Sequence, residues 1–247
     1  MKPTLTNPTS IPRTFRHALA ALALTSSLLA ARGAQAHVAI ASGTAVANTS
    51  QEITFSVGHG CAGADTARVR VELPAGVTSV RPETSDFGKT SVEKDPTGAV
   101  TAVIWQKADA DVLEADTQYY KLVVRLKIPN TPFATLLFPA HQTCRAADGT
   151  VTTVDWAALP TDPPPATGES TPAPSLAVVP SRAPGWNKLV VPLTLPALAP
   201  FFADAQIVWK GAAAYSANPT TVELIAATPG VTPLPALAAN DTVWVKY

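Results

Sequence analysis

Polar and apolar residues alternate along much of this chain, in short runs that end near glycine or proline. The clearest runs cover residues 52–57, 68–73 and 121–128. Because successive side chains of a strand point to opposite faces, each run predicts a strand with one buried face. Further strands and their turns are expected at 77–81, 90–94, 100–106, 134–138 and 151–156, with turns at 95–98 and 147–149. This spacing predicts a mainly β fold over residues 37–159, an antiparallel β-sandwich of the immunoglobulin-like type.

The chain changes character after the expected sandwich. Residues 160–180 are rich in proline, serine and threonine, which predicts an extended linker. Residues 181–247 contain candidate strands at 186–195, 207–210 and 242–246, and a candidate helix at 220–227 that follows Asn218 and Pro219. We therefore expect a small C-terminal α+β or β extension, whose role the sequence does not indicate. It contains no His, Cys or Met, so a metal site is not expected there.

The first 36 residues have the three parts of a secretory signal peptide. Lys2, Arg13 and Arg16 precede an apolar run at 18–31, and the small-residue motif 34–36 follows it. The run is too short for a membrane anchor, so we expect no membrane span in the mature chain. The sequence thus predicts export to the periplasm, or out of the cell, with His37 as the first mature residue.

Charge and motif content exclude several function classes. The signal segment carries four of the 18 Lys and Arg residues and none of the 18 acidic ones, so the mature chain is mildly acidic. Without a basic patch, binding to nucleic acid is not expected. No Ser/His/Asp arrangement or spaced pair of carboxylates indicates hydrolysis, and we do not expect an enzyme.

Two cysteines, Cys61 and Cys144, are separated by 83 positions. In an oxidising compartment a disulfide is the default interpretation. Closing a loop of this length would constrain the unfolded chain by about 4 to 5 kcal/mol in the entropy model. The alternative is a copper thiolate pair, which requires both sulfurs to be reduced.

Three histidines remain after processing: His37, His59 and His141. An N-terminal histidine supplies an amine and an imidazole on one residue, and a second imidazole would complete a T-shaped nitrogen set that suits Cu(II). His59 lies two residues before Cys61 and His141 three before Cys144, so a disulfide would draw both segments together. The competing interpretation is that His37 begins the chain by chance and that the other two are ordinary loop residues.

The segment 37–159 resembles the YcnI-like family of exported copper-binding domains. The resemblance rests on His37-Val38, on the strand and turn at 71–77, and on the motifs at 137–144 and 154–156. The Gly58-His59-Gly60-Cys61 segment, with 204–210 and 244–247, is similar to a Gram-negative branch of that family.

This resemblance implies one Cu(II) ion held by the amine and imidazole of His37, with a carboxylate and with Trp156 nearby. Where other members carry Pro-x-Glu this chain has Gly58-His59-Gly60, so we expect His59 to replace the glutamate. Weaker candidates are Glu72 as an oxygen ligand and His141. Trp156 would shield one axial face of the metal, or else close the core of the sandwich.

Three functional classes follow. The favoured one is a periplasmic protein for copper handling, passing the ion to or from a membrane transporter or an oxidase assembly factor. The others are a copper oxidoreductase with a histidine brace, and a secreted recognition or adhesion sandwich without metal. The mature chain has no methionine, which argues against a soft Cu(I) site and favours Cu(II). Since the amine and imidazole must lose protons to bind copper, affinity should fall in acid.

Overall fold

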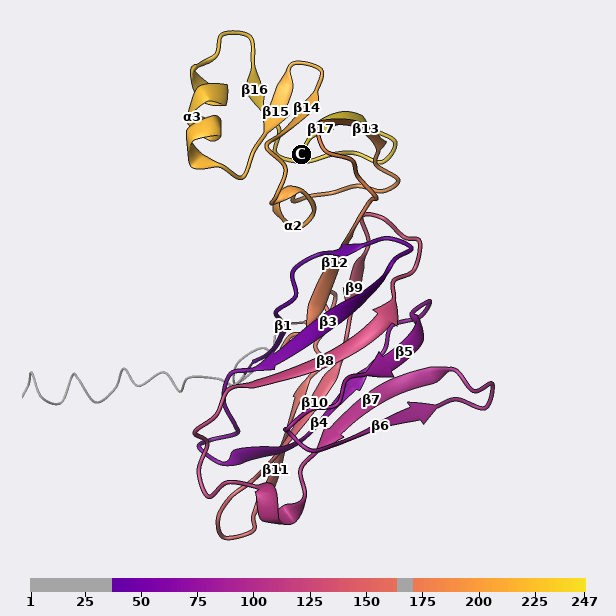
Figure 1. Ribbon diagram of the computed structural model, residues 1–247. Helices are drawn as coiled ribbons and strands as arrows, with labels where there is room; N and C mark the ends of the chain where they lie inside the picture. Colours follow the sequence, from indigo (N-terminus) through magenta and orange to yellow (C-terminus); the bar gives the residue numbers. More distant parts are fainter. Residues whose placement is uncertain (1–36, 164–170) are drawn as a thin grey trace, which may run out of the picture. The chain divides into compact units, whose positions relative to one another are not determined.

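The computed structural model describes residues 37–163 and 171–247 (Figure 1). The expected signal peptide at 1–36 and part of the expected linker, 164–170, lie outside these residues. None of the helices in the described ranges is long and apolar enough to cross a membrane.

Three sheets form the first part of the fold. A four-stranded sheet has the order β1 (Val38–Ile40), β3 (Ser50–Val57), β8 (Tyr120–Lys127), β5 (Thr78–Pro82). A five-stranded sheet has the order β11 (Val151–Trp156), β10 (Ala140–Arg145), β4 (Asp65–Glu72), β7 (Val100–Gln106), β6 (Lys89–Lys94). A small sheet joins β2 (Ala45–Val46), β12 (Ser175–Val179) and β9 (Thr135–Leu137). A 3-10 turn, η1 (Asp109–Asp111), follows β7.

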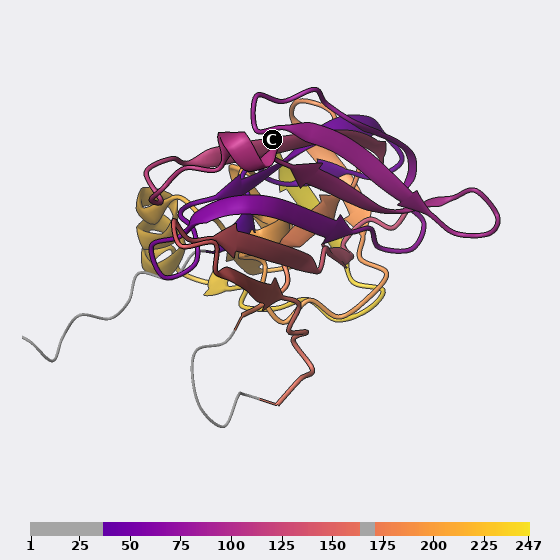
Figure 2. The ribbon, with the colours of Figure 1, turned by 90° about the horizontal axis from the view of Figure 1, so that it is seen from below.

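The alternation in the sequence explains the core of these sheets. Every second residue of the central strands is buried, and their side chains meet in one apolar cluster between the sheets. Figure 2 shows the strands of these sheets seen from below. Its members on β3, β4, β7 and β8 are Ile53, Phe55, Val57, Val69, Val71, Val103, Trp105, Leu122, Val124 and Leu126. The expected mainly β fold and antiparallel, immunoglobulin-like sandwich are thus confirmed, and the eight strands expected in this region are all present.

Four strands of the sandwich, β1, β2, β10 and β12, were not among those expected from the sequence. Strand β10 was not expected, because its buried positions are Ala140, Gln142 and Cys144 and show no apolar alternation. Strand β12 lies inside the range expected as a linker, where it pairs in parallel with β2 and antiparallel with β9. Its buried Leu176, Val178 and Val179 pack into the fold despite the surrounding prolines. The sandwich therefore extends beyond residue 159.

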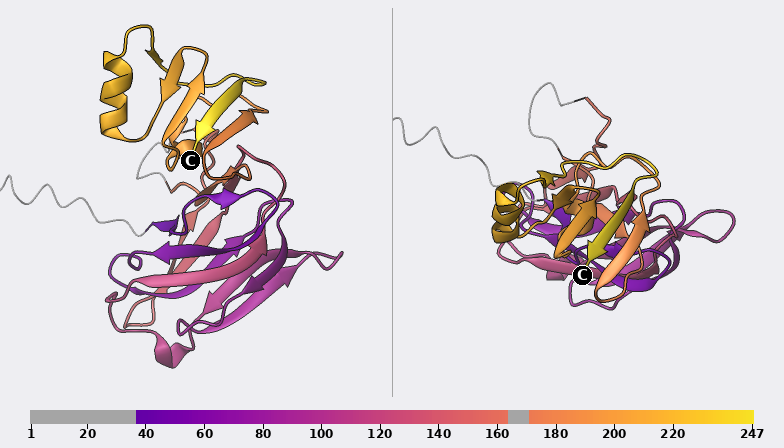
Figure 3. Two further views of the ribbon diagram at one scale, coloured as in Figure 1. Left: turned by 45° about the horizontal axis from the view of Figure 1, so that its top comes forward. Right: turned by 90° about the horizontal axis from the view of Figure 1, so that it is seen from above.

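The C-terminal region forms its own five-stranded sheet (Figure 3). The order is β13 (Trp186–Val190), β17 (Thr242–Lys246), β14 (Ile207–Lys210), β15 (Ala213–Tyr215), β16 (Thr232–Pro233). Helices α2 (Ala199–Phe202) and α3 (Pro219–Ala227) accompany it. The expected helix is present and begins as expected, because the Asn218 side chain accepts hydrogen bonds from the N–H groups of Thr220 and Thr221. The strand expected at 186–195 ends at Val190.

A second apolar cluster lies on one face of this C-terminal sheet and includes Phe202, Val243 and Val245. Phe133, which precedes β9, belongs to it, with ring centroids 5.9 Å and 5.7 Å from those of Phe201 and Phe202. The apolar cluster of the C-terminal extension therefore includes Phe133, a residue that precedes β9. The sequence alone did not decide whether the extension packs only on itself.

Candidate metal centre

A disulfide bond links the loop after β3 to β10 at one end of the candidate site. Cys61, just after β3, is bonded to Cys144 of β10, as the sequence predicted. Both residues are buried, and the backbone N–H of Cys61 also lies 2.9 Å from the Sγ atom of Cys144. Because each sulfur is already bonded to the other, a copper thiolate pair is not available in this state.

The loop that carries His59 is held by close backbone packing at Gly60. A Cβ atom built at Gly60 would lie 1.8 Å from the carbonyl oxygen of Ala64, whereas one at Gly58 would meet nothing within 4 Å. The ring of His59 is half-buried, and its Nδ1 atom lies 3.2 Å from the carbonyl oxygen of Gly60. In this conformation of the loop, only glycine fits at residue 60.

We expect the Gly60→Ala variant to lose about 2 kcal/mol of unfolding free energy, because the added methyl group forces the backbone of the loop apart. Urea unfolding of the variant and of the wild type measures this loss. Gly58→Ala is the matched control and should stay within about 0.5 kcal/mol of the wild type. Equal losses in the two variants would show that the close approach at Gly60 does not hold the loop.

His37 directly precedes β1 and lies against Trp156. The antiparallel register pairs Val38 with Val57, so the residue before β1 lies alongside the start of the 58–61 loop. The ring of His37 is 4.8 Å from that of Trp156, centroid to centroid, with the planes tilted by 38°. Trp156 is only 1% exposed, so it is a core residue and also borders His37.

Gln142 joins Trp156 to the His59 loop. Its Oε1 atom accepts a hydrogen bond from the indole N–H of Trp156 (3.1 Å), and its Nε2 donates to the carbonyl oxygen of His59 (3.0 Å) and to Thr66 Oγ1 (2.8 Å). Gln142 is fully buried. Sequence reasoning missed this residue, because a glutamine two residues before a cysteine carries no local signal of its burial.

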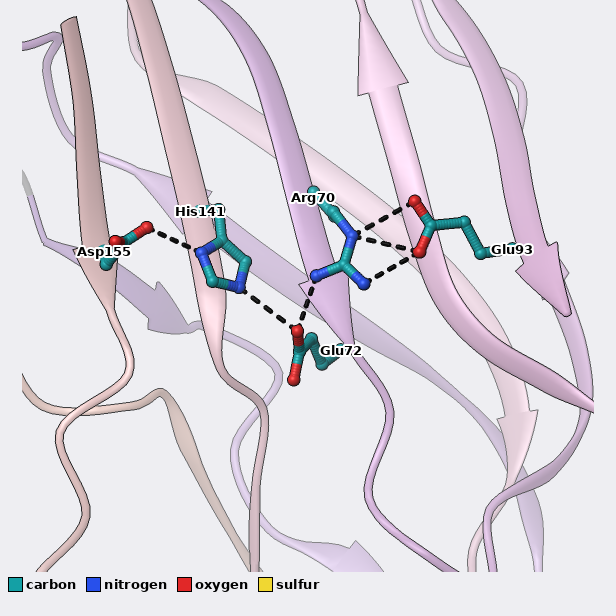
Figure 4. Close-up of polar contacts among 5 residues, drawn as sticks. All are labelled: Arg70, Glu72, Glu93, His141 and Asp155. Carbon is teal, nitrogen blue, oxygen red and sulfur yellow. Dashed lines mark hydrogen bonds and ion pairs between the residues drawn. The ribbon is translucent and has the colours of Figure 1, made fainter. Parts of the chain in front are cut away.

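His141 and Glu72 lie elsewhere, in a charged network that Figure 4 shows. The Nδ1 atom of His141 lies 2.6 Å from Asp155 Oδ1, and its Nε2 lies 3.3 Å from Glu72 Oε1. Arg70 donates to Glu72 (2.6 Å) and with two nitrogens to Glu93 (2.8 to 3.2 Å). Residues 140, 142 and 144 of β10 are buried and residue 141 faces the other way, so this network is on the opposite face from Gln142. Both ring nitrogens of His141 are thus engaged by carboxylates.

The hydrogen bonds from Arg70 hold the pKa values of Glu72 and Glu93 below the usual range for glutamate. A carboxylate whose pKa is lowered by folding stabilises the protein above its unfolded pKa, and this contribution is lost as the pH falls through the folded value. The glutamate side chains are 44% and 41% exposed, so solvent screens the interaction.

We therefore expect Arg70→Met to reduce the free energy of unfolding at neutral pH by no more than about 1 kcal/mol. The difference from the wild type should shrink as the pH falls below about 4, where both glutamates become protonated. Urea titrations across this range measure it. A difference that stays constant into strong acid would show that Arg70 acts through packing of its stem and not through these carboxylates.

The described residues bring His37, Trp156 and the His59 loop together, and place Glu72 and His141 apart from them. Among residues 37–163 and 171–247, no three His, Cys, Asp or Glu side chains are arranged to hold a metal ion. A donor that is not a side chain could take part in a copper site at His37. The α-amine of a chain that begins at residue 37 is such a donor, and with imidazole nitrogen it fits Cu(II) chemically.

A family model and several solved structures are similar to this chain. The family model described as "Domain of unknown function (DUF1775)" matches residues 37–178. Among solved structures, an uncharacterized protein from Nocardia farcinica with an immunoglobulin-like fold is 26% identical, with a TM-score of 0.47, and the match covers 58% of this chain and 98% of that one. The seventh ScaB type I cohesin from Pseudobacteroides cellulosolvens is 13% identical, with a TM-score of 0.37, over 60% of this chain and 94% of that one. No curated protein matches the sequence.

Proposed function

The chain belongs to the DUF1775 family, a domain of unknown function, and from that premise we propose that it is an exported protein that binds one Cu(II) ion at His37. The observation that supports this most is the contact between His37 and Trp156, which Gln142 ties to the His59 loop. These residues are far apart in sequence and meet beside the position where signal cleavage would create a new amine.

In this proposal the amine and imidazole of His37 hold the ion, and His59 supplies a further nitrogen. Bound there, copper would be carried as cargo for delivery or sequestration. Trp156 would cover one side of the ion, since its indole is fixed by the hydrogen bond to Gln142. We place the protein in the periplasm, exchanging copper with a membrane transporter or an oxidase assembly factor.

The test compares Cu(II) binding by two forms of the protein, one beginning at His37 and one with a single glycine ahead of it. A cleavable fusion that leaves no extra residue produces the first form. We expect the first form to bind one equivalent with nitrogen hyperfine structure in the electron paramagnetic resonance spectrum. The second should bind at least about tenfold more weakly, because its amine has become an amide. Equal binding by the two forms would place the metal elsewhere.

Two histidine variants of the form beginning at His37 then distinguish the remaining ligands. His59→Ala should weaken Cu(II) binding, whereas His141→Ala should leave it unchanged, because His141 faces Asp155 and Glu72 on the other side of its sheet. The opposite result would assign the second imidazole to His141. Hydrogen peroxide formation by the copper-loaded protein with a reductant would favour the oxidoreductase alternative.

A second candidate function, recognition of another molecule without metal, is favoured by one surface of the C-terminal sheet. Trp186 and Trp244 are 54% and 50% exposed there, and Lys188 pairs with Trp244 across β13 and β17. Exposed tryptophans that share a sheet face are typical of binding surfaces. This candidate becomes the leading one if neither form of the protein binds copper.

A further inference from the structure

A buried polar cluster lies in the sandwich, at residues that the copper proposal does not use. Asp65 begins β4, Lys107 follows β7 and Tyr120 begins β8; they are 0%, 7% and 7% exposed. The Nζ atom of Lys107 lies 2.5 Å from Asp65 Oδ2 and 2.7 Å from the hydroxyl of Tyr120. That hydroxyl donates to Asp65 Oδ1 at 2.6 Å. The amine, the carboxyl group and the hydroxyl therefore form a closed triangle.

The side chains of this triangle are buried beside two aromatic rings. The Nζ atom of Lys107 lies 5.3 Å and 4.4 Å from the ring centroids of Phe87 and Tyr120. A lysine and an aspartate removed from water lose hydration that their mutual attraction replaces only in part. Transfer of one proton from Nζ to Oδ2 converts the pair to a neutral amine and a carboxylic acid, which need less solvation.

We propose that Lys107 and Asp65 condense to form an intramolecular amide bond between β4 and the residue that follows β7. The neutral Nζ atom attacks Cγ of Asp65, and the bond from Nζ to Cγ forms. Tyr120 passes a proton from Nζ to Oδ1, and the bond from Cγ to Oδ2 then breaks. Oδ1 then gives its proton to Oδ2, which leaves as a water molecule. The amine and the carboxylic acid thus give one amide and one water molecule, and no oxidant or reductant is needed.

Other contacts position the groups for this step. Both carboxyl oxygens of Asp65 accept hydrogen bonds, from the Tyr120 hydroxyl and from the backbone N–H of Leu113 (2.8 Å), and such donors stabilise the negative charge that develops on an attacked carbonyl. The backbone N–H of Lys107 donates to the carbonyl oxygen of Ala67 (3.0 Å), so the strands stay in register without help from the side chains. This fixed proximity makes the reaction unimolecular.

A cavity and the carboxylate of Asp116 lie beside the triangle of Asp65, Lys107 and Tyr120. Lys107 and Tyr120 line a cavity of about 450 Å³, which gives the released water a route out. Asp116 has a buried carboxylate oxygen with no hydrogen-bond partner among the described residues, and its charge acts on Tyr120. Asp116 is thus a candidate positioning residue for the proton on Tyr120.

The intact mass of the protein, measured after reduction of the disulfide, tests the proposal. We expect a mass lower than that of the sequence by one water molecule. Trypsin should then release a branched species in which residues 37–68 are joined to residues 95–121, because the acylated Lys107 is no longer cleaved. A full mass after prolonged incubation of the folded protein would overturn the inference.

Variants assign the water loss to these residues. Lys107→Arg keeps the positive charge but removes the primary amine, so it should keep its full mass. Tyr120→Phe keeps the ring and should slow or abolish the loss of water. Loss that persists in Lys107→Arg, or that maps to Asp148-Gly149 as a cyclic imide, would also overturn the inference. Because no metal takes part, the outcome is independent of copper binding.

Discussion

Replacement of Trp156 by alanine is expected to lower the free energy of unfolding by about 3 to 5 kcal/mol. The side chain is only 1% exposed, and truncation leaves a cavity in the sandwich core as well as an unpaired Oε1 on Gln142. Urea unfolding measures the loss. In the form that begins at His37, the same change should alter the copper spectrum, because the indole ring borders the imidazole of His37.

The Trp156→Phe variant separates the contribution of core packing to the free energy of unfolding from that of the hydrogen bond to Gln142. Phenylalanine fills part of the space but donates nothing to Gln142, so we expect a smaller loss of about 1 to 3 kcal/mol. If Trp156→Ala were no less stable than Trp156→Phe, the indole would not be closing the core as its burial indicates.

Removal of the disulfide is the second change that should lower the free energy of unfolding strongly. We expect the Cys61→Ala, Cys144→Ala double variant to lose about 2 to 5 kcal/mol of unfolding free energy, because the bond closes a loop spanning 83 positions in the unfolded chain. Unfolding in urea with and without a thiol reductant measures this effect. The reductant should destabilise the wild type to the same extent and leave the double variant unchanged.

The disulfide also fixes the His59 loop against β10, so the double variant should bind Cu(II) more weakly than the wild type. Equal urea midpoints for the oxidised and reduced wild type would contradict the first expectation. Equal copper affinities would instead show that the packing at Gly60 holds the loop by itself.

The sequence predicted most strands of the sandwich because their buried positions are apolar. Strand β10 was not predicted, because Gln142 occupies one of its buried positions. The hydrogen-bond partners that make this burial stable come from residues 59, 66 and 156, and no local pattern encodes such a set.

The placement of His141 shows the limit of reading proximity from sequence. Its nearness to Cys144 predicted that a disulfide would bring it toward His59. In a strand, residues separated by an odd number of positions point to opposite faces, and three positions separate these two. Once β10 is recognised as a strand, the spacing itself places His141 on the other face. The disulfide could be predicted without knowledge of the strand, because the expectation rested only on two cysteines in a chain with an expected signal peptide.

Strand β12 has a consequence for how this protein completes its fold. It pairs with β2, more than a hundred residues earlier, and with β9, so the last strand of the sandwich is supplied after the proline-rich segment. A chain cut after residue 159 would keep every candidate ligand yet lack the strand that covers this part of the core. During synthesis the amino-terminal residues emerge first and must wait for residues 175–179. Long-range pairing of this kind folds slowly, so premature termination would leave the histidines on an unfinished domain.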